Sequence, residues 1–373
     1  MSTPVGPGAD RVAARLDRAR EAAAAAGVDA LVVTPGPDLQ YLTGVVKHSH
    51  ERLSALLLPV EGAASFVVPR LERPGLAGTG VDRSGMEVLD WVDGEDAHAL
   101  AAGRLGGVGR VAVAADMPAL HVLGLRDRMP AATLELATPV LRELRMRKDA
   151  DEVDALRRAG AAIDSVHAQV PGWLVAGRTE AEVGADITAA IVAAGHTEAA
   201  FVIVGSGPNG ASPHHEVSDR VLQTGDVVVV DIGGPLPEGY NSDSTRTYAV
   251  GDPGDAVREV YAVLQRAQEA GVAAARPGAT AGDVDEAARA IIRDAGYGEN
   301  FIHRTGHGIG LEVHEEPYIG GGNDLVLEPG MAFSIEPGIY LPERWGARIE
   351  DIVVVTATGC EQVNRRPRDL ISC

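Results

Sequence analysis

Residues 227–250 read VVVVDIGGPLPEGYNSDSTRTYAV, and this stretch decides the fold of the C-terminal part of the chain. An apolar run ends at Asp231, a segment rich in glycine and proline follows over 233–239, and a run of alternating polarity occupies 241–250. This pattern predicts two strands joined in a hairpin. Two-residue alternation places Asp243 on one face of the second strand, so Asp231 and Asp243 are expected on neighbouring strands a few ångströms apart.

These two aspartates have two interpretations. Ionised carboxylates at that distance repel each other unless a cation lies between them or one of them stays protonated. For an isolated pair, two solvated loop carboxylates are the better explanation. The rest of the chain therefore has to decide whether Asp231 and Asp243 form a site.

The same arrangement recurs about 100 residues later, which indicates a duplication. Each copy has a long helix, a second helix that opens with a capping-box pattern, a strand that ends in a carboxylate and a further strand with a second carboxylate. Segments 177–196 and 278–297 are identical at seven of twenty positions. The capping boxes are Thr179 with Glu182 and Thr280 with Asp283; the carboxylates are Asp231 and Asp243, then Glu336 and Glu350.

The first 145 residues alternate short apolar runs with helical patterns, which predicts a small α/β domain over 1–145 before a second domain over 146–373. Strands are expected at 30–33, 55–60, 65–68 and 111–114, and helices at 9–26 and 95–105. No catalytic cluster is evident in this part. Residues 41–44 are interpreted as a turn, and His48 and His50 as exposed loop residues.

Composition narrows the class of protein. The chain has 373 residues, is 45% hydrophobic and carries a net charge of −20, which argues against a protein that binds nucleic acid by neutralising phosphate. Residues 1–145 hold 15 basic and 18 acidic residues, whereas the remainder holds 18 and 35. Two cysteines cannot build a disulfide framework or a cysteine-rich zinc site, and no apolar stretch is long enough for a membrane span. We expect a soluble cytoplasmic protein.

Two glycine-rich motifs, over 205–210 and 303–310, have the spacing of known ligand-binding motifs. His303 and His307 have the i, i+4 spacing of a helical zinc pair, but alternating glycines over 306–310 disfavour a helix. A tight loop that fixes His307 is expected, either as a hydrogen-bonded loop histidine or as a ligand. The stretch 205–210 formally matches a dinucleotide fingerprint, but no helix start follows it, so nucleotide binding is rejected. His214 lies just after this stretch.

Four carboxylates and one imidazole would form an oxygen-dominated donor set, which favours Mn²⁺ or another borderline divalent ion. Two such cations would neutralise the four negative charges, and paired metals suit hydrolysis. On the last strand, alternation puts Arg348 and Glu350 on one face, so a guanidinium is expected beside the carboxylate. Asp351 faces the other way and is expected either near the surface or behind the metal ligands, where it would support them.

These motifs resemble those of the pita-bread metallopeptidases of family M24, which include methionine aminopeptidase, aminopeptidase P and prolidase. The resemblance implies a duplicated catalytic domain with a curved antiparallel sheet covered by helices. Residues 1–145 resemble the creatinase-type N-terminal domain, which argues against methionine aminopeptidase. One departure is a gap between Asp231 and Asp243 that is one residue longer than expected. The stretches that carry the resemblance are 230–233, 239–247, 305–314, 334–338 and 348–351.

The resemblance also implies roles for individual residues. The ligands of two divalent ions, Mn²⁺ with Co²⁺ or Zn²⁺ as alternatives, would be Asp231, Asp243, His307, Glu336 and Glu350. A metal-bridging hydroxide would attack the carbonyl before proline, and Glu336 would shuttle the proton. His214 and His314 would hold the substrate and stabilise the tetrahedral intermediate. Arg348 would orient Glu350 or bind a substrate carboxylate.

The leading hypothesis is an Xaa-Pro dipeptidase (prolidase) acting on proline-containing peptides, and its alternative is an aminopeptidase P acting on longer peptides. Two further hypotheses use the same fold: a metal-free creatinase-like hydrolase and a non-catalytic binding module. The complete ligand set argues against both. The resemblance implies a homodimer, and no nucleic-acid or membrane partner is expected.

Overall fold

The computed structural model describes residues 8–47 and 51–373, so the prediction for His48 and His50 lies outside the described residues. The chain divides into two compact units between Arg145 and Met146. Among the described residues, no helix has the length and apolar character needed to cross a membrane.

The N-terminal unit is built on a mixed six-stranded sheet with the order β4-β3-β2-β1-β5-β6. β1 pairs antiparallel with β2 and parallel with β5, and all four of its residues are buried. The strands are β1 (Ala30–Val33), β2 (Ala55–Pro59), β3 (Ser65–Pro69), β4 (Glu87–Trp91), β5 (Arg110–Val113) and β6 (Thr133–Leu136). The helices are α1 (Ala9–Ala25), α2 (Pro37–Thr43), η1 (Arg73–Leu76), α3 (Gly80–Arg83), α4 (Ala97–Leu105), α5 (Ala119–Arg128) and α6 (Thr138–Met146).

The strands and helices predicted for this unit are confirmed to within two residues at each end. The interpretation of residues 41–44 as a turn is wrong: residues 41–43 are the end of α2, and Gly44 caps it. The helix stops there because Gly44 adopts a left-handed conformation with φ 69°, which favours glycine.

In the C-terminal unit, the first copy of the predicted duplication forms two helices and a three-stranded antiparallel segment, with β17 added at its edge. Both capping-box bonds form at the start of α8. The hairpin is confirmed, but β8 continues four residues beyond Asp231. The elements are α7 (Ala150–His167), η2 (Val170–Gly172), α8 (Glu180–Ala193), β7 (Phe201–Ser206), η3 (Gly207–Ala211), β8 (Val227–Pro235) and β9 (Asn241–Ala249).

The second copy repeats the pattern, with the capping box again formed at α10. Its sheet has the order β11-β10-β12-β15-β16, beside a separate two-stranded ribbon of β13 and β14. The helices are α9 (Asp255–Ala274), α10 (Ala281–Asp294) and η4 (Gly298–Asn300). The strands are β10 (Gly306–Gly308), β11 (Glu315–Ile319), β12 (Ala332–Ile335), β13 (Gly338–Leu341), β14 (Trp345–Arg348), β15 (Asp351–Val355), β16 (Cys360–Gln362) and β17 (Ile371–Ser372).

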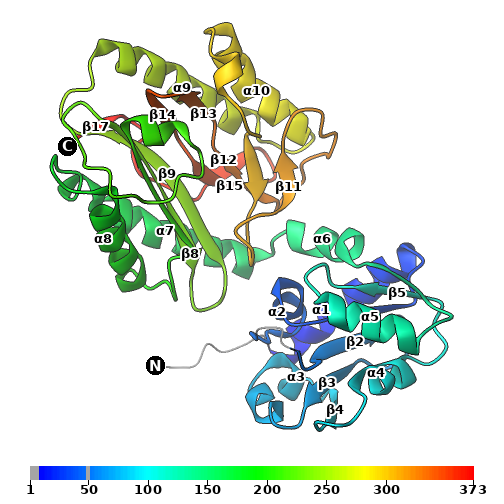
Figure 1. Cartoon of the computed structure of the whole chain (residues 1–373). Coiled ribbons are helices and arrows are strands. Elements are labelled where there is room, and N and C mark those ends of the chain that lie inside the picture. Colours follow the sequence, from blue (N-terminus) through cyan, green and yellow to red (C-terminus); the bar gives the residue numbers. More distant parts are fainter. Residues whose placement is uncertain (1–7, 48–50) are drawn as a thin grey trace. The chain divides into compact units, whose positions relative to one another are not determined.

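In each half, helices pack on the sheet (Figure 1), and each half has an apolar core between its helices and its sheet. Ile163 of α7 and Ile187 of α8 pack with Val230 of β8, and Val284 of α10 packs with Phe333 of β12. The halves join where the backbone N–H of Glu350 donates to the carbonyl of Thr245, 3.1 Å away. This seam brings the acidic residues of both halves together.

Candidate metal centre

The first half supplies two carboxylates from its hairpin. Asp231 on β8 lies opposite Thr245, and Asp243 on β9 lies opposite Gly233, so the two aspartates are diagonal neighbours on one face of the sheet. Both are buried, with 8% and 3% of their surface exposed. Asp231, Asp243 and Glu350 each offer an oxygen atom, and these atoms lie within 4.8 Å of one another.

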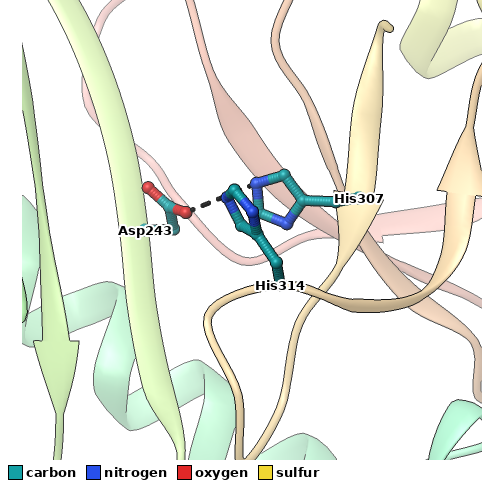
Figure 2. Close-up of side chains that lie close together, drawn as sticks. All are labelled: Asp243, His307 and His314. Carbon is teal, nitrogen blue, oxygen red and sulfur yellow. Dashed lines mark ion pairs between the residues drawn. The ribbon is translucent and has the colours of Figure 1, made fainter. Parts of the chain in front are cut away.

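The second half supplies two glutamates and an imidazole. Glu336 directly follows β12, and His307 lies in the middle of the short strand β10. The Nε2 atom of His307 lies 3.1 Å from Glu336 Oε1. It also lies 3.6 Å from Asp243 Oδ2, and Figure 2 shows this ion pair. His307, Glu336 and Glu350 form a second group of ligand atoms within 4.8 Å. Asp243, His307 and His314 form a third such group, so Glu350 belongs to two of the three groups of potential metal ligands.

These residues fit divalent cations because their carboxylates lack hydrogen-bond partners and repel one another. Among the described residues, Asp231 Oδ1 and Glu350 Oε1 are buried without a hydrogen-bond partner, which is costly for a carboxylate. Burial, together with the neighbouring carboxylates, raises the pKa of both Asp243 and Glu350 well above the usual range. A cation in this position would satisfy the oxygen atoms and remove the repulsion.

His307 and Glu336 form a charged pair in the absence of a cation. Burial works to lower the pKa of His307, but the hydrogen bond and charge of Glu336 overcome it and raise the pKa to about 9. Burial likewise works to raise the pKa of Glu336, and His307 brings it down to about 2. Because a metal binds neutral imidazole, loading the site would release the proton of His307.

Arg348 holds the carboxylate of Asp231 in place. Its guanidinium donates to Asp231 Oδ2 at 2.6 Å, to Thr245 Oγ1 at 3.1 Å and to the hydroxyl of Tyr340 at 2.7 Å. Thr245 Oγ1 in turn donates to Glu350 Oε2 at 2.8 Å. Arg348 therefore orients Asp231 directly and Glu350 only through Thr245, and these bonds disfavour a role in binding a substrate carboxylate.

Two expectations for this strand are wrong. Arg348 and Glu350 do not share a strand face, because β14 ends at Arg348 and β15 begins at Asp351. Of the two alternatives for Asp351, the surface position is wrong: Asp351 is fully buried and accepts from the Arg246 guanidinium at 2.6 Å. The chain breaks the strand at the seam between the halves, where Glu350 bonds to β9 instead.

All eight residues predicted for the site line one cavity of about 880 Å³. His214 lies in the loop after η3, and the ring of His314 lies 3.8 Å from that of His307, centroid to centroid (Figure 2). Sequence reasoning missed the apolar wall, since nothing in the local pattern marks it. The wall consists of Phe201, Ile203, Pro213 and Val313. The other cavity residues that were not predicted are His303, Arg304 and Glu312.

The buried carboxylate of Glu180 fixes the loop over 207–217, which carries His214. Glu180, at the start of α8, is fully buried and accepts from the backbone N–H of Ser206 at 2.7 Å, Ser218 Oγ at 2.6 Å and His215 Nε2 at 2.8 Å. These contacts tie down both ends of the loop that carries His214. Sequence reasoning missed Glu180, although its place next to the capping threonine was visible.

The second half has an anchor of the same kind. Asp285 on α10 accepts from the backbone N–H and the hydroxyl of Thr305, at 3.0 and 2.8 Å. Arg289 pairs with Asp285 at 2.8 Å and donates to the carbonyl of His303 at 2.8 Å. Asp285 therefore fixes the segment that enters β10 and carries His307.

The fold and this donor set define a class: a two-fold duplicated α/β unit that binds divalent metal ions mainly through buried oxygen ligands. Comparison with known families agrees with it. Residues 154–357 match metallopeptidase family M24, and residues 15–147 match the creatinase/prolidase N-terminal domain.

Three relatives extend the match over almost the whole chain. A probable dipeptidase PepE from Mycobacterium tuberculosis is 59% identical over 97% of both chains. An Xaa-Pro dipeptidase from Lactobacillus delbrueckii subsp. lactis is 36% identical, covering 92% of this chain and 95% of its own. The crystal structure of a prolidase from Thermococcus sibiricus superposes with a TM-score of 0.90 at 38% identity, over 96% of this chain and 98% of its own.

The chain belongs to metallopeptidase family M24, with a creatinase-like N-terminal domain and a pita-bread catalytic domain. It is a metal-dependent peptidase, as the sequence predicted.

Proposed function

We propose that this chain is an Xaa-Pro dipeptidase that works with two divalent ions, Mn²⁺ in the first place. The observation that carries the proposal is the convergence of four carboxylates and His307 at one cavity, where Asp231 Oδ1 and Glu350 Oε1 have no hydrogen-bond partner among residues 8–47 and 51–373. Relatives named dipeptidase and Xaa-Pro dipeptidase support the substrate class and disfavour the aminopeptidase P alternative.

We infer a division of the ligands between two ions. Asp231, Asp243 and Glu350 would hold one ion, and His307 and Glu336 would complete the other, with Asp243 and Glu350 shared. When bound, such ions supply Lewis-acid polarisation of a carbonyl group and lower the pKa of water. The four carboxylate charges would balance two divalent cations, so the loaded centre would be close to neutral.

The protein groups around the centre suit the remaining tasks. Glu336 lines the cavity beside His307, and in the loaded centre its carboxylate would be placed to accept a proton and return it to the leaving nitrogen. Burial and the neighbouring His307 lower the pKa of His314 to about 4, so its imidazole is neutral at physiological pH and able to hydrogen-bond the substrate. His214 lines the same cavity, and we assign it the same role.

The preference for proline has a physical basis. The bond before proline is a tertiary amide with no N–H and with a fixed backbone angle, so a peptidase cannot bind it by pairing with that N–H. A site that holds the carbonyl through metal ions and histidines does not need the missing donor. The apolar side chains of Phe201, Ile203 and Val313 offer a wall for the proline ring.

The test is hydrolysis by the purified full chain after loading with Mn²⁺. Ala-Pro should be cleaved, Ala-Leu much more slowly, and chelator should abolish both reactions. The tripeptide Ala-Pro-Ala should be a poor substrate, and its efficient cleavage would favour the aminopeptidase. Absence of hydrolysis of either proline substrate with any divalent metal would contradict the proposal and favour the creatinase-like hydrolase or the binding module. We also expect a cytoplasmic homodimer, which light scattering and cell fractionation would check.

A further inference from the structure

Two arginines line the cavity, and they differ in how they are used. The guanidinium of Arg348 is engaged by Asp231, Thr245 and Tyr340. Arg304 is half-buried and its guanidinium lies over the ring of Tyr318, with the guanidinium carbon 4.1 Å from the ring centroid. Within residues 8–47 and 51–373, the side chain of Arg304 forms no hydrogen bond or ion pair. Arg304 is therefore an unpaired cation at the wall of the substrate cavity.

The backbone on both sides of Arg304 is fixed. The carbonyl of His303 accepts from Arg289, and the N–H of Thr305 donates to Asp285. The stacking on Tyr318 further limits the side chain. A guanidinium held in this way loses little conformational freedom when it binds an anion, and its planar fork matches a carboxylate.

Dipeptides and longer peptides differ chemically on the far side of the bond that is cleaved. A dipeptide carries a negative carboxylate on the residue after that bond, whereas a longer peptide carries a neutral amide there. A charged hydrogen bond from a guanidinium to a carboxylate is about twice as strong as a bond between neutral groups. An unpaired arginine in the cavity thus favours the dipeptide.

Resting on the proposed function, we propose that Arg304 binds the C-terminal carboxylate of the substrate and thereby makes the enzyme a dipeptidase. Arg304 is a specificity residue in this account, and the metal ligands act equally on both kinds of substrate.

The test compares Ala-Pro with Ala-Pro-amide, which lacks only the negative charge, in the Mn²⁺-loaded full chain. Arg304→Gln should lower kcat/KM for Ala-Pro about 10- to 100-fold, mainly through KM, and should change the amide less than about twofold. Arg304→Lys should recover part of the loss. Arg276→Gln, which removes an exposed arginine of the same unit, is the matched control and should change neither substrate.

Several results would overturn the proposal. An equal loss on both substrates would show a general defect, and no loss on Ala-Pro would show that Arg304 does not touch the carboxylate. A loss confined to Glu-Pro, with Ala-Pro unchanged, would assign Arg304 to an acidic first side chain instead. If the wild-type protein cleaves neither Ala-Pro nor its amide, the proposed function itself fails and this inference falls with it.

Discussion

The two halves of the C-terminal unit deliver carboxylates to the same centre from different backbone positions. Asp231 and Asp243 lie within the long paired strands β8 and β9. Glu336 and Glu350 lie just outside strands, one after β12 and the other before β15. A glutamate has one more methylene than an aspartate, which suits a carboxylate that starts from beyond a strand end. Duplication thus repeats the chemistry without repeating the geometry.

The imidazole appears in only one half, and the register explains why. Asp231 lies opposite Ile203, and the backbone N–H of Glu336 donates to the carbonyl of Thr305. Two residues further along, the first half has Gly205 and the second half has His307. A Cβ atom at Gly205 would lie 3.1 Å from the backbone of the following turn, so a side chain is crowded out there. This close contact disfavours a side chain in the first half at the position that His307 occupies in the second.

The largest expected effect comes from removing one carboxylate from either half. Asp243→Asn and Glu336→Gln should each lower kcat/KM at least about 1000-fold, because each disrupts the binding of both ions or the proton transfer. Steady-state kinetics on Ala-Pro with Mn²⁺ would measure this. Asp252→Asn, at an exposed aspartate just after β9, is the control and should have no effect. Retention of more than a tenth of the activity in either variant would show that its half is dispensable.

An intermediate effect is expected from the two loop anchors, and it should differ in kind between the halves. Glu180→Gln loosens the loop of His214, so kcat/KM should fall about tenfold while the Mn²⁺ affinity stays unchanged. Asp285→Asn loosens the segment before His307, so the Mn²⁺ affinity should fall about 10- to 100-fold. Metal titration and kinetics on both variants would separate the two. Glu198→Gln, at an exposed glutamate, is the control, and identical profiles for the two anchors would refute the distinction.

Local patterns were enough to predict much of this unit. The capping boxes at Thr179 and Thr280 and the hairpin over 227–250 depend on neighbouring residues alone, and all of them form. The break in the strand between Arg348 and Asp351 depends on how the halves meet, which no local alternation contains. The burial of Asp351 has the same origin, because its partner Arg246 comes from the other half.

The two arginines of the cavity, Arg348 and Arg304, also show what local sequence patterns cannot predict. The sequence predicts Arg348 beside a carboxylate but does not say that Asp231, rather than Glu350, is its direct partner. Arg304 lies between His303 and His307 in the sequence, and only the folded structure shows that it lines the cavity and packs on Tyr318.

The smallest effect concerns acid stability, where the halves again differ. His167 of α7 is fully buried between the Tyr248 hydroxyl and the Ser244 carbonyl, each 3.0 Å away, and burial lowers its pKa to about 3. The residue 101 positions later, Gln268, does not titrate and donates to Asp351 at 3.0 Å. At this pair of equivalent positions, only the first half therefore carries a group that makes stability sensitive to acid.

The sign follows from proton uptake. Between about pH 6.5 and pH 3 the unfolded state binds the proton of His167 and the folded state does not, so stability falls as the pH falls, by up to about 1.4 kcal/mol per pH unit. His167→Gln makes the first half resemble the second and should flatten this dependence. Urea unfolding of the chelator-treated protein at pH 7 and pH 5 would test it, and parallel curves for wild type and variant would contradict it.

The central claim is that the two halves together build one centre for two divalent ions. Isothermal titration of the chelator-treated full chain with Mn²⁺, followed by an activity measurement at each point, tests it most directly. We predict saturation at two ions per chain, with full activity only when both are bound, and we predict weakened binding when either Asp231→Asn or Glu336→Gln is introduced. Saturation at a single ion with full activity, or no binding at all, would contradict the account.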